Sequence, residues 1–282
     1  MMAHVMNLTR WEWYKLRRRW MPWIMLGLML VVSQGFVWGS YFFNRSEQSR
    51  GVYDNFTLPG SIPNALGLAY SIGIFLIVIL TASVLGTEYR WRTLRSIIAR
   101  GTGRWQYLAS KAMLLALVAA GALVIVMAAT AVSSLIAGAL AGDAPSGSSD
   151  SARWLDVPIV FGKAWFAFLP YIALTAFFTV LTTSSAAGTA ISLVYYYAES
   201  IVAAIFINLF TWFETAASYM LGRNATAWMT SGDGDFAISP LMGGRFGTFP
   251  SALHAFLVLV VYILALGGLA LWRFRRRDLT GD

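Results

Sequence analysis

The sequence predicts an all-α integral membrane protein with six transmembrane helices, and two properties of the chain support this prediction. First, 58% of its 282 residues are hydrophobic and only 12% are charged. Soluble domains carry about 25% charged residues, so a soluble fold has too little polar surface to cover such a chain. Second, a helix needs about 20 mostly apolar residues to cross a bilayer, and six segments meet this requirement. They are residues 22–43, 66–85, 108–140, 164–181, 187–210 and 253–272.

The arrangement of these segments indicates a single transmembrane domain over residues 1–282. The fourth and fifth segments are separated only by residues 182–186, a short polar stretch that predicts a tight turn between two helices. The connection at 211–252 is longer and rich in aromatic residues and glycine. We expect it to be an extracytoplasmic loop that packs on the outer face of the membrane.

Lysine and arginine predict how the chain is oriented in the membrane. Most of the 21 basic residues precede the first segment, lie between the second and third, or follow the sixth. Because cytoplasmic flanks are enriched in Lys and Arg, we expect both termini in the cytoplasm of a multi-pass protein of the cell (inner or plasma) membrane. A net charge of +8 would suggest nucleic acid as a partner of a soluble protein. Here the basic residues flank apolar segments, so we expect membrane lipid, and no nucleic acid, as the partner.

The residue inventory excludes several kinds of chemistry. The chain has no cysteine, so it can form no disulfide, thiolate nucleophile or cysteine-ligated metal site. Its two histidines, His4 and His254, lie far apart in sequence, and we expect no metal site. The phosphate-binding pattern Gly-x-x-x-x-Gly-Lys-Ser/Thr is missing, so we expect that the chain is not itself an ATPase. We therefore expect no catalytic residues and no cofactor in this chain.

Residues 1–20 combine aromatic and basic side chains, which is typical of a helix lying in the membrane interface. Thr9 and Glu12 have the spacing of a capping box, so we expect this interfacial helix to begin near Thr9. The alternative is that the segment is simply the basic flank of the first transmembrane helix.

The connection at residues 88–106, between the second and third segments, has a helical pattern of its own. Trp91, Leu94 and Ile98 recur at the spacing of one helix face, and a Gly-Thr-Gly sequence then interrupts the helix. A short amphipathic helix held between two transmembrane helices is a suitable docking element for a soluble partner. The alternative is a basic loop that has no partner. The residues that we expect at such a contact are Glu88, Arg92, Leu94, Arg95, Ile98 and Arg100.

Three regions of the chain carry a pattern of short motifs. In residues 86–111 the motif residues are Gly86, Glu88, Thr93-Leu94-Arg95, Arg104, Tyr107-Leu108 and Lys111. The other two motifs are Glu12-Trp-Tyr-Lys15-Leu near the start and Phe274-Arg-Arg-Arg-Asp278 near the end. This pattern resembles that of the type-2 ABC transporter permeases. The chain departs from the family pattern at Arg92, where glycine is common, and at Gly101-Thr102, where proline is common.

The resemblance implies that residues 88–106 contain a coupling helix, which in that family inserts into a cleft on the nucleotide-binding subunit. It therefore implies a separate ABC ATPase subunit, which binds ATP and Mg, and a second permease chain that is identical or homologous. The implied function is that of the transmembrane subunit of an ATP-driven exporter, which forms the substrate pathway. Drugs, antimicrobial peptides, lipids and ions are all candidate cargo.

Glu199 lies near the middle of the fifth segment and is a candidate for the substrate pathway. A carboxylate at the bilayer centre costs roughly 2.5–3.5 kcal/mol on insertion scales, so we expect it to face protein or water. Two readings stay open. Either Glu199 is protonated and bonds to a Tyr, Ser or Thr on a neighbouring helix, or it lines a central cavity together with Tyr196, Asn208 and Gln34.

Two other classes of function are compatible with a polytopic membrane chain. A membrane-embedded enzyme would need paired carboxylates or a His/Ser/Asp set at matching depth. Glu199 is alone near a helix centre, and His254 lies at a helix end without an evident partner, which disfavours an enzyme. The other alternative is a non-transporting subunit of a membrane sensor or resistance complex.

Overall fold

The computed structural model describes residues 2–44, 56–90, 103–141, 151–232, 238 and 249–276, and within these ranges the regular structure is entirely helical. The helices are α1 (Met2–Arg17), α2 (Trp20–Asn44), α4 (Ser61–Arg90), α6 (Arg104–Leu140), α7 (Ser151–Thr182), α8 (Ser185–Leu209), α9 (Thr211–Ala217), α10 (Leu221–Thr230) and α11 (Ala252–Arg276).

Six of these helices, α2, α4, α6, α7, α8 and α11, are long and apolar enough to cross a membrane, which confirms the predicted fold class. The largest difference from the sequence prediction is the start of the fourth transmembrane helix, expected at 164 and found at Ser151. The helix continues through Pro158 and Lys163, which precede the predicted start. It does so because Val160 and Ala164 are buried one turn apart on the face that packs inside the bundle.

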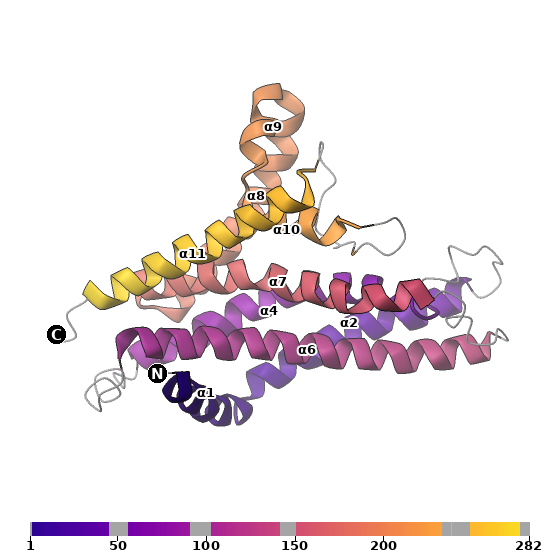
Figure 1. The fold of residues 1–282 in the computed structure, drawn as a ribbon, viewed down its shortest axis with the longest axis horizontal. Helices are drawn as coiled ribbons and strands as arrows, with labels where there is room; N and C mark the ends of the chain where they lie inside the picture. The colour runs from indigo at the N-terminus through magenta and orange to yellow at the C-terminus, as the bar shows by residue number, and fades with distance from the viewer. Residues whose placement is uncertain are drawn as a thin grey trace.

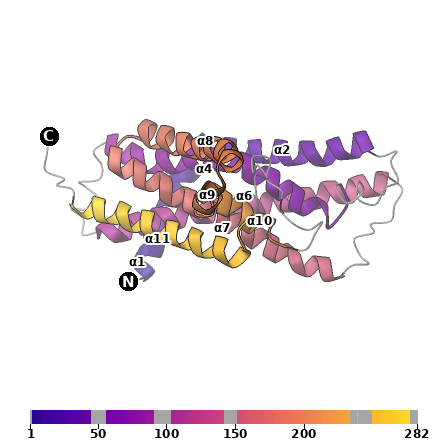
Figure 2. The ribbon, with the colours of Figure 1, turned by 90° about the horizontal axis from the view of Figure 1, so that it is seen from above.

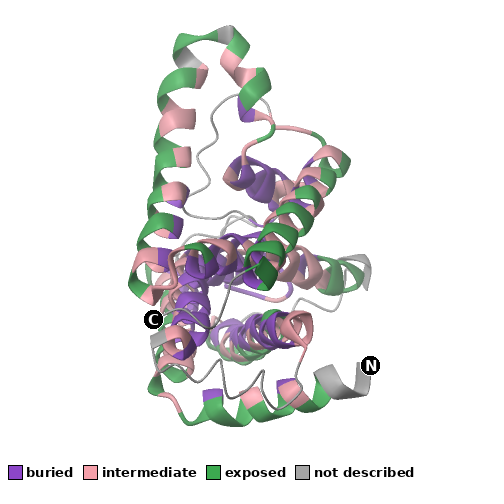
Figure 3. Ribbon diagram, turned by 90° about the vertical axis from the view of Figure 1, so that its left-hand side faces the viewer, coloured by how far each residue is buried: buried purple, intermediate pink, exposed green. Residues whose placement is uncertain are grey.

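Helices α4 and α7 form the centre of the bundle, and the other transmembrane helices surround them (Figures 1 and 2). Most of the α4 and α7 spans is buried, whereas less than a quarter of the α2, α8 and α11 spans is buried (Figure 3). The exposed residues of these outer helices are largely apolar. A bilayer accommodates such a surface, because lipid tails are as apolar as the side chains that meet them.

Helix α1 and the last turn of α11 lie at the same end of the bundle, here called the terminal end (Figures 1 and 2). The last turn of α4, the first turn of α6 and the connection between α7 and α8 lie at this end too. The basic residues of α1 and of the last turn of α11 are therefore gathered at one end of the molecule.

The connection between α7 and α8 is the tight turn that the sequence predicts. Thr183 adopts a left-handed backbone conformation with φ of 55°, and Ser184 caps α8 by accepting a hydrogen bond from the Ala187 N–H at 3.3 Å. Gly86 of α4 lies directly against this turn, because a Cβ atom added there would come within 2.4 Å of the Ser185 Cβ. Only glycine allows α4 to approach the start of α8 so closely.

The described part of the predicted loop at 211–252 contains two short helices. Helix α10 lies between α8 and α11 where these two helices diverge, and it also packs against α7 (Figures 1 and 3). Seven of the ten residues of α10 are buried, so this helix is part of the packed interior. The amide nitrogen of the buried Asn224 side chain donates to the Ser218 and Met220 carbonyls at 2.7 Å each, which attaches α10 to the segment before it.

Candidate functional site

Three charged side chains from three different helices meet at the terminal end, and we call Glu12, Glu88 and Lys111 the ion cluster. Lys111 of α6 donates to a carboxylate oxygen of Glu12 in α1 and to one of Glu88 in α4, both at 2.8 Å. The Lys111 side chain is only 1% exposed, and those of Glu12 and Glu88 are 13% and 11% exposed. The cluster therefore joins the N-terminal helix to the two transmembrane helices that flank residues 91–102.

Further polar contacts hold the ion cluster in place. The Tyr107 hydroxyl of α6 donates to the second carboxylate oxygen of Glu88, and Lys15 donates to Glu12 at 2.8 Å. The Tyr107 ring stacks on Phe274 of α11, with centroids 5.7 Å apart and planes inclined by 16°. In this way α11 also contacts the cluster, and both oxygens of each carboxylate have a partner.

The charges in the ion cluster determine the protonation of Glu12. Burial acts to raise the pKa of this carboxyl, but the charge of Lys111 and hydrogen bonds from Lys111 and Lys15 outweigh burial, and the pKa is lowered from its ordinary value. Glu12 is thus ionised at neutral pH and forms true ion pairs with both lysines.

The ion cluster forms the base of the predicted coupling segment. Glu88 lies in the last turn of α4 and Lys111 near the start of α6, so their contact brings together the two ends of that segment. Five of the predicted contact residues lie outside the described part of the structure: Arg92, Leu94, Arg95, Ile98 and Arg100. Glu88, the sixth, faces Lys111 and Tyr107 inside the chain, and a direct role in partner contact stays a prediction.

The sequence analysis did not predict the ion cluster, and it assigned Glu12 to a capping box with Thr9. The predicted capping box is wrong, because α1 begins at Met2 and Thr9 lies in its interior. Glu12 instead reaches across to α6. A signal was present in the sequence, since Lys111 interrupts an apolar run and a buried lysine needs an acidic partner; the choice between the available carboxylates required the fold.

A second polar contact lies farther from the terminal end and centres on Glu199 of α8. One of its carboxylate oxygens accepts hydrogen bonds from the backbone N–H groups of Gly222 and Arg223, the latter at 3.3 Å. These groups belong to the first turn of α10, where a negative charge is stabilised by the unpaired N–H groups and the helix dipole. Glu199 therefore attaches α10 to α8, through backbone donors that neither sequence reading anticipated.

The other residues predicted for the substrate pathway occupy different contacts. Tyr196 is buried and packs edge-on against Phe75 of α4 and Tyr171 of α7. The Gln34 amide of α2 hydrogen-bonds with Ser133 and Thr130 of α6. Gln34 therefore contacts α6, whereas Glu199 contacts α10. Asn208 belongs to the last turn of α8, and its side chain lies outside the described part of the structure.

No combination of groups suited to metal binding is present among the described residues, where no three His, Cys, Asp or Glu side chains lie together. His254 contacts the Ser218 carbonyl at 3.0 Å and the Tyr219 ring, with centroids 5.2 Å apart. These contacts attach the start of α11 to the segment between α9 and α10.

These features define a class: a polytopic helical membrane protein whose N-terminal helix is attached by buried ion pairs to the bases of two transmembrane helices. The chain belongs to a transporter family, since the model described as ABC-2 family transporter protein matches residues 8–199, more than half of its length. The match includes Glu12, Glu88 and Lys111 and ends at Glu199. The resemblance seen in the sequence motifs is thus confirmed. Among curated proteins, none matches the chain.

Proposed function

We propose that this chain is the transmembrane subunit of an ATP-driven ABC exporter, which forms the substrate pathway and couples it to a separate ATPase subunit. Membership of the ABC-2 family supports a membrane permease component of an ABC transporter. The observation that carries the proposal is the ion cluster, because it fixes the base of the predicted coupling segment to the N-terminal helix through contacts of 2.8 Å.

The described contacts supply a route by which movement of residues 91–102 reaches the rest of the bundle. Glu88 and Lys111 hold the last turn of α4 to the start of α6, so a displacement of the segment moves both helices together. Gly86 transmits the movement of α4 to the start of α8, since the two backbones are in close contact there. Helix α8 carries Glu199, which attaches α10, and in this scheme α10 follows α8.

The coupling proposal is tested with the chain co-expressed with its ATPase. We expect the two to co-purify, and we expect Leu94→Ala and Arg95→Ala to lower transport-stimulated ATP hydrolysis, since truncating an interface anchor costs about 2 kcal/mol or more. Leu117→Ala, on the exposed face of α6, and Arg45→Ala, which lies outside the predicted coupling segment in the sequence, are matched controls. Unchanged assembly and coupling in both loop variants would refute the docking role.

The orientation follows the same proposal. The gathering of basic residues at the terminal end favours a cytoplasmic location for this end, which leaves residues 211–252 on the outside. Reporter fusions at Ser49, Ser148 and Asp233 should then report an outside location, and fusions at Gly101 and after the last residue an inside location. An outside signal at Gly101 would overturn the topology.

The proposed complex has two permease chains and two ATPase subunits. Exposed apolar residues of α8 recur on one face and could meet a second permease chain as readily as lipid: Ile191, Val194, Tyr197, Ile201 and Ile205. Because the chain has no cysteine, Val194→Cys provides a unique thiol. Disulfide-linked dimers in native membranes would support this contact, and Val261→Cys, on the exposed face of α11, is the control.

The role of Glu199 in the pathway is separable from its attachment of α10. Glu199→Gln removes the charge but keeps an oxygen that can accept from Gly222 and Arg223, whereas Glu199→Ala removes both. If the charge contacts a cationic or polar substrate, Glu199→Gln lowers transport while the free energy of unfolding changes little. Normal transport of every tested substrate by Glu199→Gln would leave only the structural role.

A further inference from the structure

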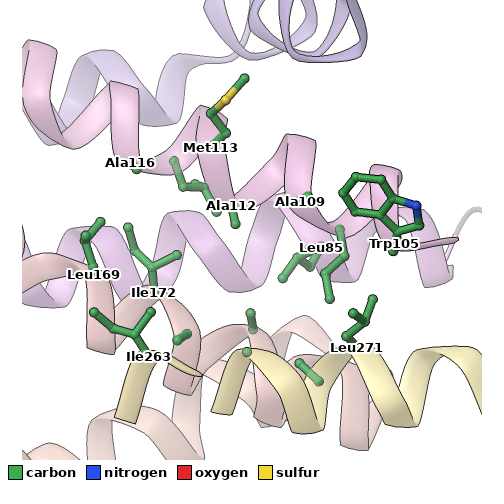
Figure 4. Close-up of a pocket in the computed structure, with 16 residues that line it drawn as sticks. Leu85, Trp105, Ala109, Ala112, Met113, Ala116, Leu169, Ile172, Ile263 and Leu271 are labelled. Atoms are coloured by element: carbon green, nitrogen blue, oxygen red, sulfur yellow. The ribbon is translucent and has the colours of Figure 1, made fainter. Parts of the chain in front are cut away.

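An apolar cavity lies between α6, α7 and α11 in the half of the bundle nearer the terminal end (Figure 4). Its volume is about 390 Å³, within the range of about 300–1,000 Å³ that is typical of small-molecule sites. Small side chains leave this space open: Ala109, Ala112, Ala116, Ala173 and Gly267 all line it. Among the lining residues, the indole of Trp105 supplies the one side-chain nitrogen or oxygen.

The cavity opens to the outside of the bundle. Ala112, one of its lining residues, is exposed, and both α6 and α11 are candidate membrane spans. An opening between two transmembrane helices faces the hydrocarbon of the bilayer, and its apolar lining suits an acyl chain.

Positive charge lies at the end of the cavity that faces the terminal end. Arg273 follows the lining residue Ala270 by three positions, and Arg275 follows the lining residue Leu271 by four, so the two arginines flank the cavity side of α11. Both arginines are exposed. An Arg104 N–H donates to the Arg275 carbonyl, so the first turn of α6, which bears a further positive charge, is fixed beside them.

We propose that the cavity holds one acyl chain of an anionic phospholipid from the leaflet at the terminal end, with the lipid phosphate beside Arg273 and Arg275. The apolar lining accounts for the chain, and the basic helix ends account for the preference for a negative headgroup. Each basic residue near the surface adds about 1 kcal/mol of attraction to anionic lipid. The occupant is a lipid of defined charge at a defined site between three helices.

The headgroup contact is tested with neighbouring arginines of the same helix turn. Arg276 contacts the Trp272 ring, at 4.6 Å from the ring centroid, and it does not follow a lining residue by three or four positions. Full-length protein is reconstituted in phosphatidylcholine vesicles that contain a minor fraction of phosphatidylglycerol, and retained lipid is identified by native mass spectrometry. We expect Arg275→Gln to weaken phosphatidylglycerol retention about fivefold and Arg276→Gln to leave it near the wild-type level.

The cavity itself is tested with Ala112→Phe, which fills it, against Ala128→Phe, which adds the same side chain at an exposed position of the same helix. Ala112→Leu is a smaller substitution for the case in which the phenylalanine variant does not fold. Lipid in the cavity is detected through Trp105, which lines it. Brominated phosphatidylglycerol quenches tryptophan fluorescence, and the quenching that the wild type shows beyond that of Trp105→Phe reports lipid bound in the cavity. We expect both the quenching difference and the retained lipid to be lost in Ala112→Phe only.

Three results would overturn the proposal. Equal retention of phosphatidylcholine and phosphatidylglycerol by the wild-type protein would exclude selection by charge. Equal effects of Arg275→Gln and Arg276→Gln would reduce the contact to general surface attraction. Loss of permease dimers in Ala112→Phe, with lipid retention unchanged, would show that a second copy of the chain, and not a lipid, covers the cavity.

Discussion

Lys111→Met is the substitution that most directly tests the ion cluster. Methionine keeps the length and apolar stem of the side chain but removes the charge, so the Glu12 and Glu88 carboxylates lose their common partner while staying mostly buried. Removing one member of a buried ion pair costs about 3–5 kcal/mol, because the remaining charge is uncompensated. Since one lysine serves both carboxylates, we expect a single loss in this range.

The matched control for this substitution is Lys15→Met. Lys15 bonds to the same carboxylate, Glu12, at the same distance of 2.8 Å, but its side chain is 54% exposed. Exposed ion pairs contribute about 0–1 kcal/mol, so Lys111→Met should lower the free energy of unfolding several times more than Lys15→Met does. The triple variant Glu12→Gln, Glu88→Gln, Lys111→Met removes every charge of the cluster and should recover most of the loss.

The free energy of unfolding is measured by reversible denaturation in mixed micelles, with intrinsic tryptophan fluorescence as the signal. ATPase assembly with each variant is measured in parallel. The reasoning would be refuted if Lys111→Met cost no more than Lys15→Met, or if the triple variant were no more stable than Lys111→Met alone. Either result would mean that the buried contacts do not hold the three helices together.

Three further predictions concern pH and two backbone contacts. The lowered pKa of Glu12 contributes stability above the ordinary value of 4.5, and this contribution is lost as pH falls through the folded-state pKa; the stability difference between wild type and Glu12→Gln should therefore be constant at neutral pH and shrink in acid below about pH 4.5. Gly86→Ala places a Cβ within 2.4 Å of the Ser185 Cβ and should cost about 1–3 kcal/mol, whereas Gly121→Ala, which meets nothing within 4 Å, should be tolerated; equal melting temperatures would contradict the close contact. Thr183→Asn should raise the free energy of unfolding by about 1 kcal/mol, because asparagine adopts the left-handed conformation more readily, and a loss of stability would show that the turn is not strained.

The transmembrane helices could be predicted from the sequence because length and apolarity are local properties. The start of α7 could not, since Pro158 and Lys163 are loop signals that burial of the neighbouring apolar face overrides. The tight turn before α8 was predictable from its polar composition. Its close contact with Gly86 was not, because it joins residues almost a hundred positions apart in sequence.

The candidate site was predictable only in part. The motif that contains Gly86, Glu88 and Lys111 was recognised, but a motif does not say which side chains touch. Periodicity cannot reveal that Glu12 pairs with Lys111, because the pairing depends on how α1 crosses the start of α6. The same limit applies to Glu199, whose partners are backbone N–H groups of a short helix that hydropathy does not detect.

The ion cluster also constrains the order in which the chain can be completed during membrane insertion. Glu12 and Glu88 leave the ribosome before Lys111, so both carboxylates reach the membrane boundary without the charge that later neutralises them. Until α6 arrives, α1 and the last turn of α4 each retain an acidic group that favours water over the bilayer. A truncated chain that ends before Lys111 should therefore remain loosely inserted, and the smallest stable insertion intermediate extends through α6.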